Sequence, residues 1–132
     1  MAVFRNIDDA RAYFAADRFA VENGMVLEEL GDGYSVCTVE LSARHRNANN
    51  EVMGGAIFTL ADFAFAAAAN HRHRLTVAQQ VSVNYLSGTR GTKLTARAEC
   101  KKDGRSSCVY NIDVTDDLGR SIAQVVTTGF KL

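Results

Sequence analysis

The chain has 132 residues, of which 47% are hydrophobic and 23% charged, a composition typical of a globular protein and not of a disordered segment. Fifteen lysines and arginines balance fifteen aspartates and glutamates, so the net charge gives no general attraction to nucleic acid or to an anionic membrane. A chain of this length supports one hydrophobic core, and we expect one domain over residues 1–132.

The N-terminal residues 1–19 carry early charges and no uninterrupted apolar core, which excludes a secretory signal or a membrane-spanning start. We therefore expect a cytoplasmic protein without a membrane partner. Residues 7–24 begin with acidic side chains and then place apolar ones at helical spacing. This pattern predicts a short amphipathic helix that Asp8 or Asp9 opens and that Asn23-Gly24 ends.

Two short segments, residues 25–30 and 34–41, flank the turn sequence Gly31-Asp32-Gly33, and the second alternates between two faces. They predict a β-hairpin. A polar loop, residues 42–52, leads to Gly54-Gly55 and then to an apolar run that ends near Ala69. This run is shorter than the roughly 20 residues of a membrane span, and we expect it to form a buried helix.

Four strand-like segments fill the rest of the chain, at residues 76–86, 92–102, 106–116 and 120–132. Glycine-containing turns separate them, which predicts an antiparallel meander. The three cysteines, Cys37, Cys100 and Cys108, lie in strand-like segments without metal-ligand spacing or an even count, so we expect small buried side chains.

The order of elements predicts an α+β fold in which a curved antiparallel sheet of about six strands wraps around one long central helix. Such a helix is about 25 Å long at 1.5 Å per residue. Because its side chains are apolar nearly all round, the sheet of one chain cannot cover every side. We therefore expect a homo-oligomer, with a second subunit supplying part of the cover.

Asp62 is the one carboxylate in the middle of this apolar helix. Burying an ionised carboxylate without partners costs several kcal/mol of folding free energy or raises the pKa of the group. A carboxylate with a raised pKa suits a general base or nucleophile. The structural alternative is that Asp62 binds a buried backbone group or caps another element. Gly54-Gly55 either makes a tight turn or exposes backbone N–H groups at the positive end of the helix, where an oxyanion would be stabilised.

The segment NANNEVMGGAIFTLAD, which holds Asn47, Gly54, Gly55 and Asp62, resembles the hotdog-fold acyl-CoA thioesterases of the PaaI (phenylacetate-degradation) type. The order of helices and strands over nearly the whole chain is also that of this family. One difference stands out: the family usually has histidine before the two glycines, and this chain has Met53.

The resemblance implies a hotdog fold and an acyl-CoA thioesterase, a homodimer or homotetramer, whose active site lies at a subunit interface. Gly55 would donate its N–H to the thioester carbonyl, and Asp62 of the other subunit would act as nucleophile or general base. Asn47 would position the water or the thioester. Gly54, the pocket wall Met53, and the strand residues Gln79 and Gln80 would contact the substrate. His45 could replace the missing imidazole, but we expect it to be an exposed loop histidine.

The reaction needs no metal and no cofactor, because the thioester carbonyl is itself electrophilic. Two other functions stay open: an acyl-CoA-binding protein without catalysis and, since it needs a histidine paired with an acid, a less favoured hydratase or dehydratase of acyl thioesters. Nucleic-acid binding is not indicated, because no basic stripe with interleaved aromatic residues occurs.

Overall fold

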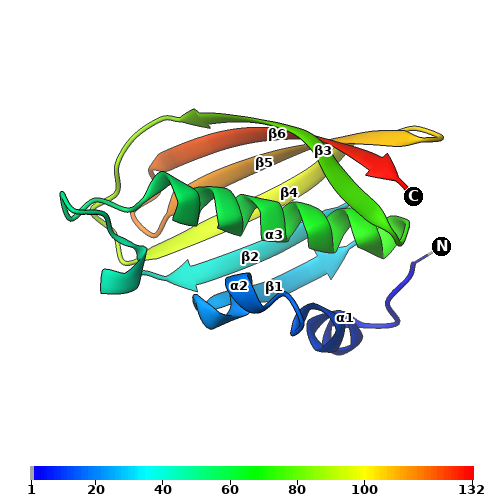
Figure 1. Cartoon of the computed structure of the whole chain (residues 1–132), viewed down its shortest axis with the longest axis horizontal. Coiled ribbons are helices and arrows are strands. Elements are labelled where there is room, and N and C mark those ends of the chain that lie inside the picture. The colour runs from blue at the N-terminus through cyan, green and yellow to red at the C-terminus, as the bar shows by residue number, and fades with distance from the viewer. Residues whose placement is uncertain (1) are drawn as a thin grey trace.

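In the computed structural model, which describes residues 2–132, a six-stranded antiparallel sheet wraps around one long helix that runs along its concave side (Figure 1). The expected α+β architecture is thereby confirmed. The helices are α1 (Ile7–Phe14), α2 (Arg18–Glu22) and α3 (Gly54–Arg72), with a short 3₁₀ turn at Ala43–His45. The strands are β1 (Met25–Gly31), β2 (Tyr34–Glu40), β3 (Thr76–Tyr85), β4 (Lys93–Asp103), β5 (Ser107–Asp116) and β6 (Ser121–Lys131).

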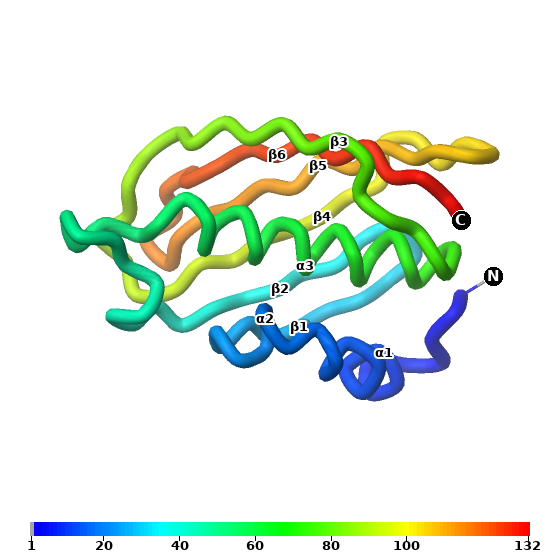
Figure 2. Tube along the Cα trace, viewed as in Figure 1, coloured from blue at the N-terminus to red at the C-terminus, as the bar shows by residue number. Residues whose placement is uncertain are grey.

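The strand order is β1-β2-β4-β5-β6-β3, so the four C-terminal strands do not form a simple meander as expected. β4 pairs with β2 and with β5, whereas β3 pairs with β6 at the far edge (Figure 2). The connection at residues 86–92 is longer than the two to five residues of a tight hairpin, which allows the chain to cross between non-adjacent strands. β3 is consequently an edge strand, and most of its side chains are exposed.

The N-terminal region forms two helices, where the sequence pattern predicted one. Asn6, and not Asp8 or Asp9, caps α1, because its side-chain oxygen accepts the N–H of Asp9 at 2.9 Å. The chain then breaks before Asp17, which stands at the cap position of α2 without making a side-chain capping bond. α2 ends at Asn23 and Gly24, as expected.

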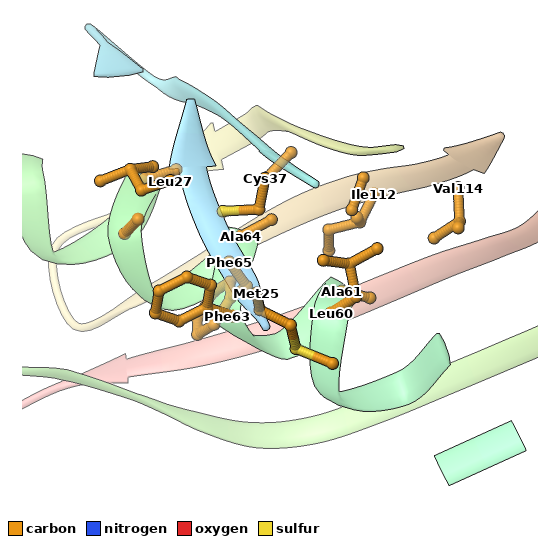
Figure 3. Packing of buried hydrophobic residues seen from close by; sticks show 14 of the residues in the cluster. Met25, Leu27, Cys37, Leu60, Ala61, Phe63, Ala64, Phe65, Ile112 and Val114 are labelled. Carbon is orange, nitrogen blue, oxygen red and sulfur yellow. The ribbon is translucent and has the colours of Figure 1, made fainter. Parts of the chain in front are cut away.

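Small side chains let α3 lie close to the sheet. Leu60 and Ala64 of its inner face are fully buried (Figure 3), and so is Ala67. Phe65 packs edge-to-face on Tyr110 of β5, with ring centroids 5.5 Å apart. Cys37 and Cys108 are buried and Cys100 is half-buried, and all three are free thiols.

The opposite face of α3 is not covered by the sheet of its own chain. Gly55 is exposed, and Phe58, Thr59, Asp62 and Ala66 keep partial exposure at a spacing of three or four residues. These positions form one helical stripe, which we call the open face of α3. Among the helices of residues 2–132, none has the length and apolar character to cross a membrane.

Candidate active site

The open face of α3 begins at two backbone N–H groups that the fold leaves free. Ala56 and Ile57 both donate to the carbonyl of Met53, at 3.0 and 3.3 Å. Gly54 and Gly55 precede them in the first turn, where α-helical N–H groups have no intrahelical acceptor, and neither donates to a backbone carbonyl of residues 2–132. The two N–H groups therefore stand at the positive end of the helix, ready to bind a carbonyl oxygen or an oxyanion.

Close neighbours favour glycine at position 54 but not at position 55. A Cβ atom at Gly54 would lie 3.1 Å from the ring of Tyr85, whose hydroxyl donates to the Gly54 carbonyl at 3.0 Å. At Gly55, the nearest atom to an added Cβ would be Met53 Cγ at 4.0 Å, so no neighbour in the chain requires glycine there. What the bare Gly55 does provide is open access to the start of the helix.

Asp62 lies two turns further along the open face and is half-buried. Burial raises the pKa of its carboxyl, and the negative charge of Asp17 raises it further. No hydrogen bond from residues 2–132 stabilises the carboxylate. A desolvated carboxylate without an internal partner is a stronger base than an exposed one, so this group can accept a proton from a bound water or alcohol.

Two adjoining cavities, each of about 300 Å³, flank these groups. One is lined by Gly55 and Met53, and the other by Asp62 and Asp17. Phe19, Phe58 and Thr59 line both cavities and so form the wall between them. Seven residues separate Gly55 from Asp62, about 10 Å along the helix axis, too far for both to act on one carbonyl within the same chain.

Asn47 lies in the exposed loop before α3 and organises that loop. Its side-chain oxygen accepts the N–H groups of Asn49 and Glu51, at 2.9 and 3.1 Å. Only the amide NH₂ of Asn47 remains available, so in a site it would donate and not accept. Asn47 does not line either cavity described above.

The other expected contact residues fall in two places. Met53 precedes α3, is 54% exposed and lines the cavity of Gly55, as a pocket wall would. Gln79 and Gln80 are exposed on the edge strand β3, beside the register shift between Ala78 and Gln80, and line neither cavity. The chain by itself does not bring them to the start of α3.

His45 is buried, in contrast to the exposed loop histidine that the sequence suggested. It is 3% exposed, its Nδ1 accepts the N–H of Ser42 at 3.0 Å, and its Nε2 donates to the carbonyl of Asn23 at 2.7 Å. Both ring nitrogens are used, so His45 cannot replace the missing imidazole. Its bond to Asn23 links the loop before α3 to the end of α2.

Two residues of this region are not predicted from the sequence. The sequence pattern places Asp17 inside one continuous helix, whereas its position beside Asp62 depends on the break between α1 and α2. Tyr85 falls within the predicted strand at residues 76–86, and its contact with Gly54 depends on the placement of β3 at the edge of the sheet. An acidic residue just before a short apolar segment was the one available signal, for Asp17.

Comparisons with known proteins agree with this geometry. Residues 49–123 match the model of the thioesterase superfamily. The chain is 30% identical over 116 residues to the acyl-coenzyme A thioesterase PaaI of Escherichia coli. The aligned region covers 87% of this chain and 83% of that protein. The solved structure of E. coli PaaI superposes with a TM-score of 0.89 at 26% identity, over 96% of this chain and 92% of that one.

A hypothetical thioesterase of Streptococcus pneumoniae, solved with coenzyme A, has a TM-score of 0.81 at 28% identity, covering 89% of this chain and 94% of that one. The matched region includes both the start of α3 and Asp62, and the sheet order and the central helix correspond over nearly the whole chain. The chain therefore belongs to the thioesterase superfamily, as a hotdog-fold member of the PaaI type.

Proposed function

We propose that the protein hydrolyses acyl-CoA thioesters to a free acid and coenzyme A. The observation that carries this proposal is the pairing, on one open face of α3, of free N–H groups at the helix start with the desolvated carboxylate of Asp62. The names of the E. coli and S. pneumoniae relatives support coenzyme A as the thiol part of the substrate.

The reaction needs one oxyanion donor and one base. The thioester carbonyl oxygen accepts the N–H of Gly55, which gains strength as negative charge develops on that oxygen. Asp62 takes a proton from a water molecule as the water oxygen bonds to the carbonyl carbon. Collapse of the tetrahedral intermediate breaks the carbon–sulfur bond, and the thiolate leaves with the bonding electrons and then takes up a proton.

The two groups come from different subunits in this proposal. An antiparallel pair of α3 helices related by a two-fold axis places residue 55 of one chain opposite residue 62 of the other when the axis passes between Phe58 and Thr59. Each dimer then holds two equivalent sites. This arrangement also covers the open face of α3, which the sheet of one chain leaves half-exposed.

The hydratase alternative is disfavoured by the state of the histidines. Both ring nitrogens of His45 are bound inside the protein. His71 is buried near the opposite end of α3 and accepts the N–H of Phe4 at 3.3 Å, and His73 caps the end of that helix. A non-catalytic binding protein would keep the same cavities, and the following experiment separates it from an enzyme.

The test is the Asp62→Asn variant, measured for thiol release from acyl-CoA substrates and for melting temperature on the same preparation. We expect turnover to fall by about 10²-fold or more, because a base is lost. Melting temperature should hold or rise at neutral pH, because an amide is cheaper to bury than a carboxylate. A destabilised variant that still hydrolyses thioesters would contradict the role of Asp62, and a wild type that binds but never turns over would contradict catalysis.

A further inference from the structure

A small apolar cavity lies next to the cavity of Gly55, between the N-terminal helices and the sheet. Its volume is about 200 Å³, and side chains of α1, α2, β1 and α3 line it. Phe14, Val21, Leu27 and Phe63 give it hydrophobic walls. Figure 1 shows α1 and α2 lying along β1, where this cavity is found. We call it the β1 cavity.

One side chain, Met25, lines both the β1 cavity and the cavity of Gly55. Met25 is the first residue of β1 and is 3% exposed. A methionine side chain is unbranched and has three rotatable bonds, so it can turn aside for a flexible ligand at low cost. The two cavities therefore form one path, from the start of α3 to β1, when Met25 changes its rotamer.

The polar side chains that border this path are already bound within the protein. Both ring nitrogens of His45 are used. Arg44, Asn23 and Thr59 each donate to a backbone carbonyl of α2 or α3. Arg11, at the β1 cavity, donates to a backbone carbonyl of β1 at 2.8 Å. A ligand with amides, hydroxyl groups or charges would have to compete with these bonds, whereas a hydrocarbon would leave them intact.

We propose that the cavity of Gly55 and the β1 cavity together bind a linear, unsubstituted acyl chain, whose tail passes Met25 and ends in the β1 cavity. The placement of the thioester at Gly55 rests on the proposed function. An aryl ring is rigid and stops in the cavity of Gly55, whereas a saturated chain can bend past Met25. The enzyme therefore prefers medium-chain acyl-CoA to short-chain and aryl thioesters.

The expected selectivity follows from the burial of methylene groups. Each methylene that leaves water for an apolar cavity, and stays buried in the transition state, raises kcat/KM by about fourfold. A decanoyl chain has four methylenes more than a hexanoyl chain. We expect wild type to prefer decanoyl-CoA to hexanoyl-CoA by about 10²-fold in kcat/KM, and to treat phenylacetyl-CoA like hexanoyl-CoA.

The kinetic test fills the β1 cavity with the variant Val21→Phe. Val21 lines the β1 cavity and not the cavity of Gly55, so a larger side chain there takes up the space for the end of a long chain. We expect the decanoyl-to-hexanoyl ratio of kcat/KM to fall from about 10² to about one. Thiol release from both substrates gives this ratio.

A second variant and a control make the kinetic result independent of the folding of Val21→Phe. Ala15→Phe enlarges an exposed residue that lines the same cavity, and it should lower the ratio in the same way. The matched control is Val109→Phe, at a half-buried position of β5 that lines neither cavity. Its ratio should equal that of wild type. Melting curves show which variants are folded.

A binding measurement keeps this inference separate from catalysis. S-decyl- and S-hexyl-coenzyme A are thioethers, which cannot be hydrolysed, and titration calorimetry gives their affinities. We expect wild type and the control to bind the decyl compound about 10²-fold more tightly, and both β1-cavity variants to bind the two compounds equally. Equal affinities in wild type, or an unchanged ratio in both β1-cavity variants, would overturn the inference. If wild type hydrolyses no thioester but keeps the decyl preference, the proposed function fails and the tail site stands.

Discussion

At the scale of the residue, the fold tolerates Asp62 by leaving it half-buried on an open face and not within the core. Its pKa is raised above that of an exposed aspartate, first by burial and then by Asp17. A group with a raised folded-state pKa stabilises the fold at low pH, and this contribution is lost as pH rises through that pKa. The melting-temperature difference between Asp62→Asn and wild type should therefore shrink as the pH is lowered.

Asp17 provides a way to change the basicity of Asp62 without touching it. The groups that face Asp62 across its cavity are Asp17 and Arg18 of the α2 region, and Arg18 is paired with Glu22. We expect Asp17→Asn to lower the pKa of Asp62 and to move the acidic limb of the kcat/KM profile to lower pH, because a neighbouring negative charge is removed. The measurement is thiol release across a pH series.

The matched control for this prediction is Asp113→Asn, which removes the same charge from an exposed position on β5. Its acidic limb should coincide with that of wild type. If the acidic limb of the Asp17→Asn profile stays in place or moves to higher pH, Asp17 does not act on the proposed base, Asp62.

At the scale of the element, α3 packs against the sheet with one face and holds the candidate site on the other. Its inner face is packed with alanines and leucine against the sheet, and its open face holds two cavities and a carboxylate. The loop before it is held by His45, so the helix start is fixed before any substrate binds. A fixed donor needs no reorganisation when charge develops on the substrate.

The helix start can be tested with two substitutions of the same glycine. Gly55→Pro removes the N–H, in a first turn where proline is tolerated, and should reduce kcat by about 10²–10³-fold. Gly55→Ala keeps the N–H and meets no neighbour closer than 4.0 Å, and we expect kcat within about tenfold of wild type. Steady-state kinetics on one acyl-CoA, with melting curves for both variants, make the comparison. Equal losses would indicate that the bare surface of Gly55 matters and its N–H does not.

Much of this element structure could be predicted from the sequence. Alternation and glycine turns placed the strands within a few residues of their observed bounds, and the apolar run placed α3. The pairing of β3 with β6 could not be predicted, since periodicity gives the faces of a strand and not its neighbours. The position of Asp17 beside Asp62 and the bonds of His45 depend on contacts between distant segments, which no local pattern encodes.

At the scale of the whole molecule, two uncovered surfaces support the expectation of a homo-oligomer. One is the open face of α3, and the other is the edge strand β3, where Val77 and Tyr85 are 38% and 54% exposed. An unpaired edge strand next to an apolar helix face favours association with a second copy. We expect light scattering at micromolar concentration to give at least twice the 14.4 kDa mass of the chain. A monomer at that concentration would contradict this expectation.

The most direct test of the proposed shared active site mixes the variants Gly55→Pro and Asp62→Asn, each expected to be nearly inactive alone, and measures thiol release after their subunits exchange. A mixed dimer contains one site with an intact Gly55 from one chain and an intact Asp62 from the other. If both chains build each site, random exchange should restore about a quarter of wild-type activity, because about half of the dimers are mixed and each has one intact site. If mixed dimers form, as shown by differently tagged chains, and activity does not return, Gly55 and Asp62 do not meet across subunits.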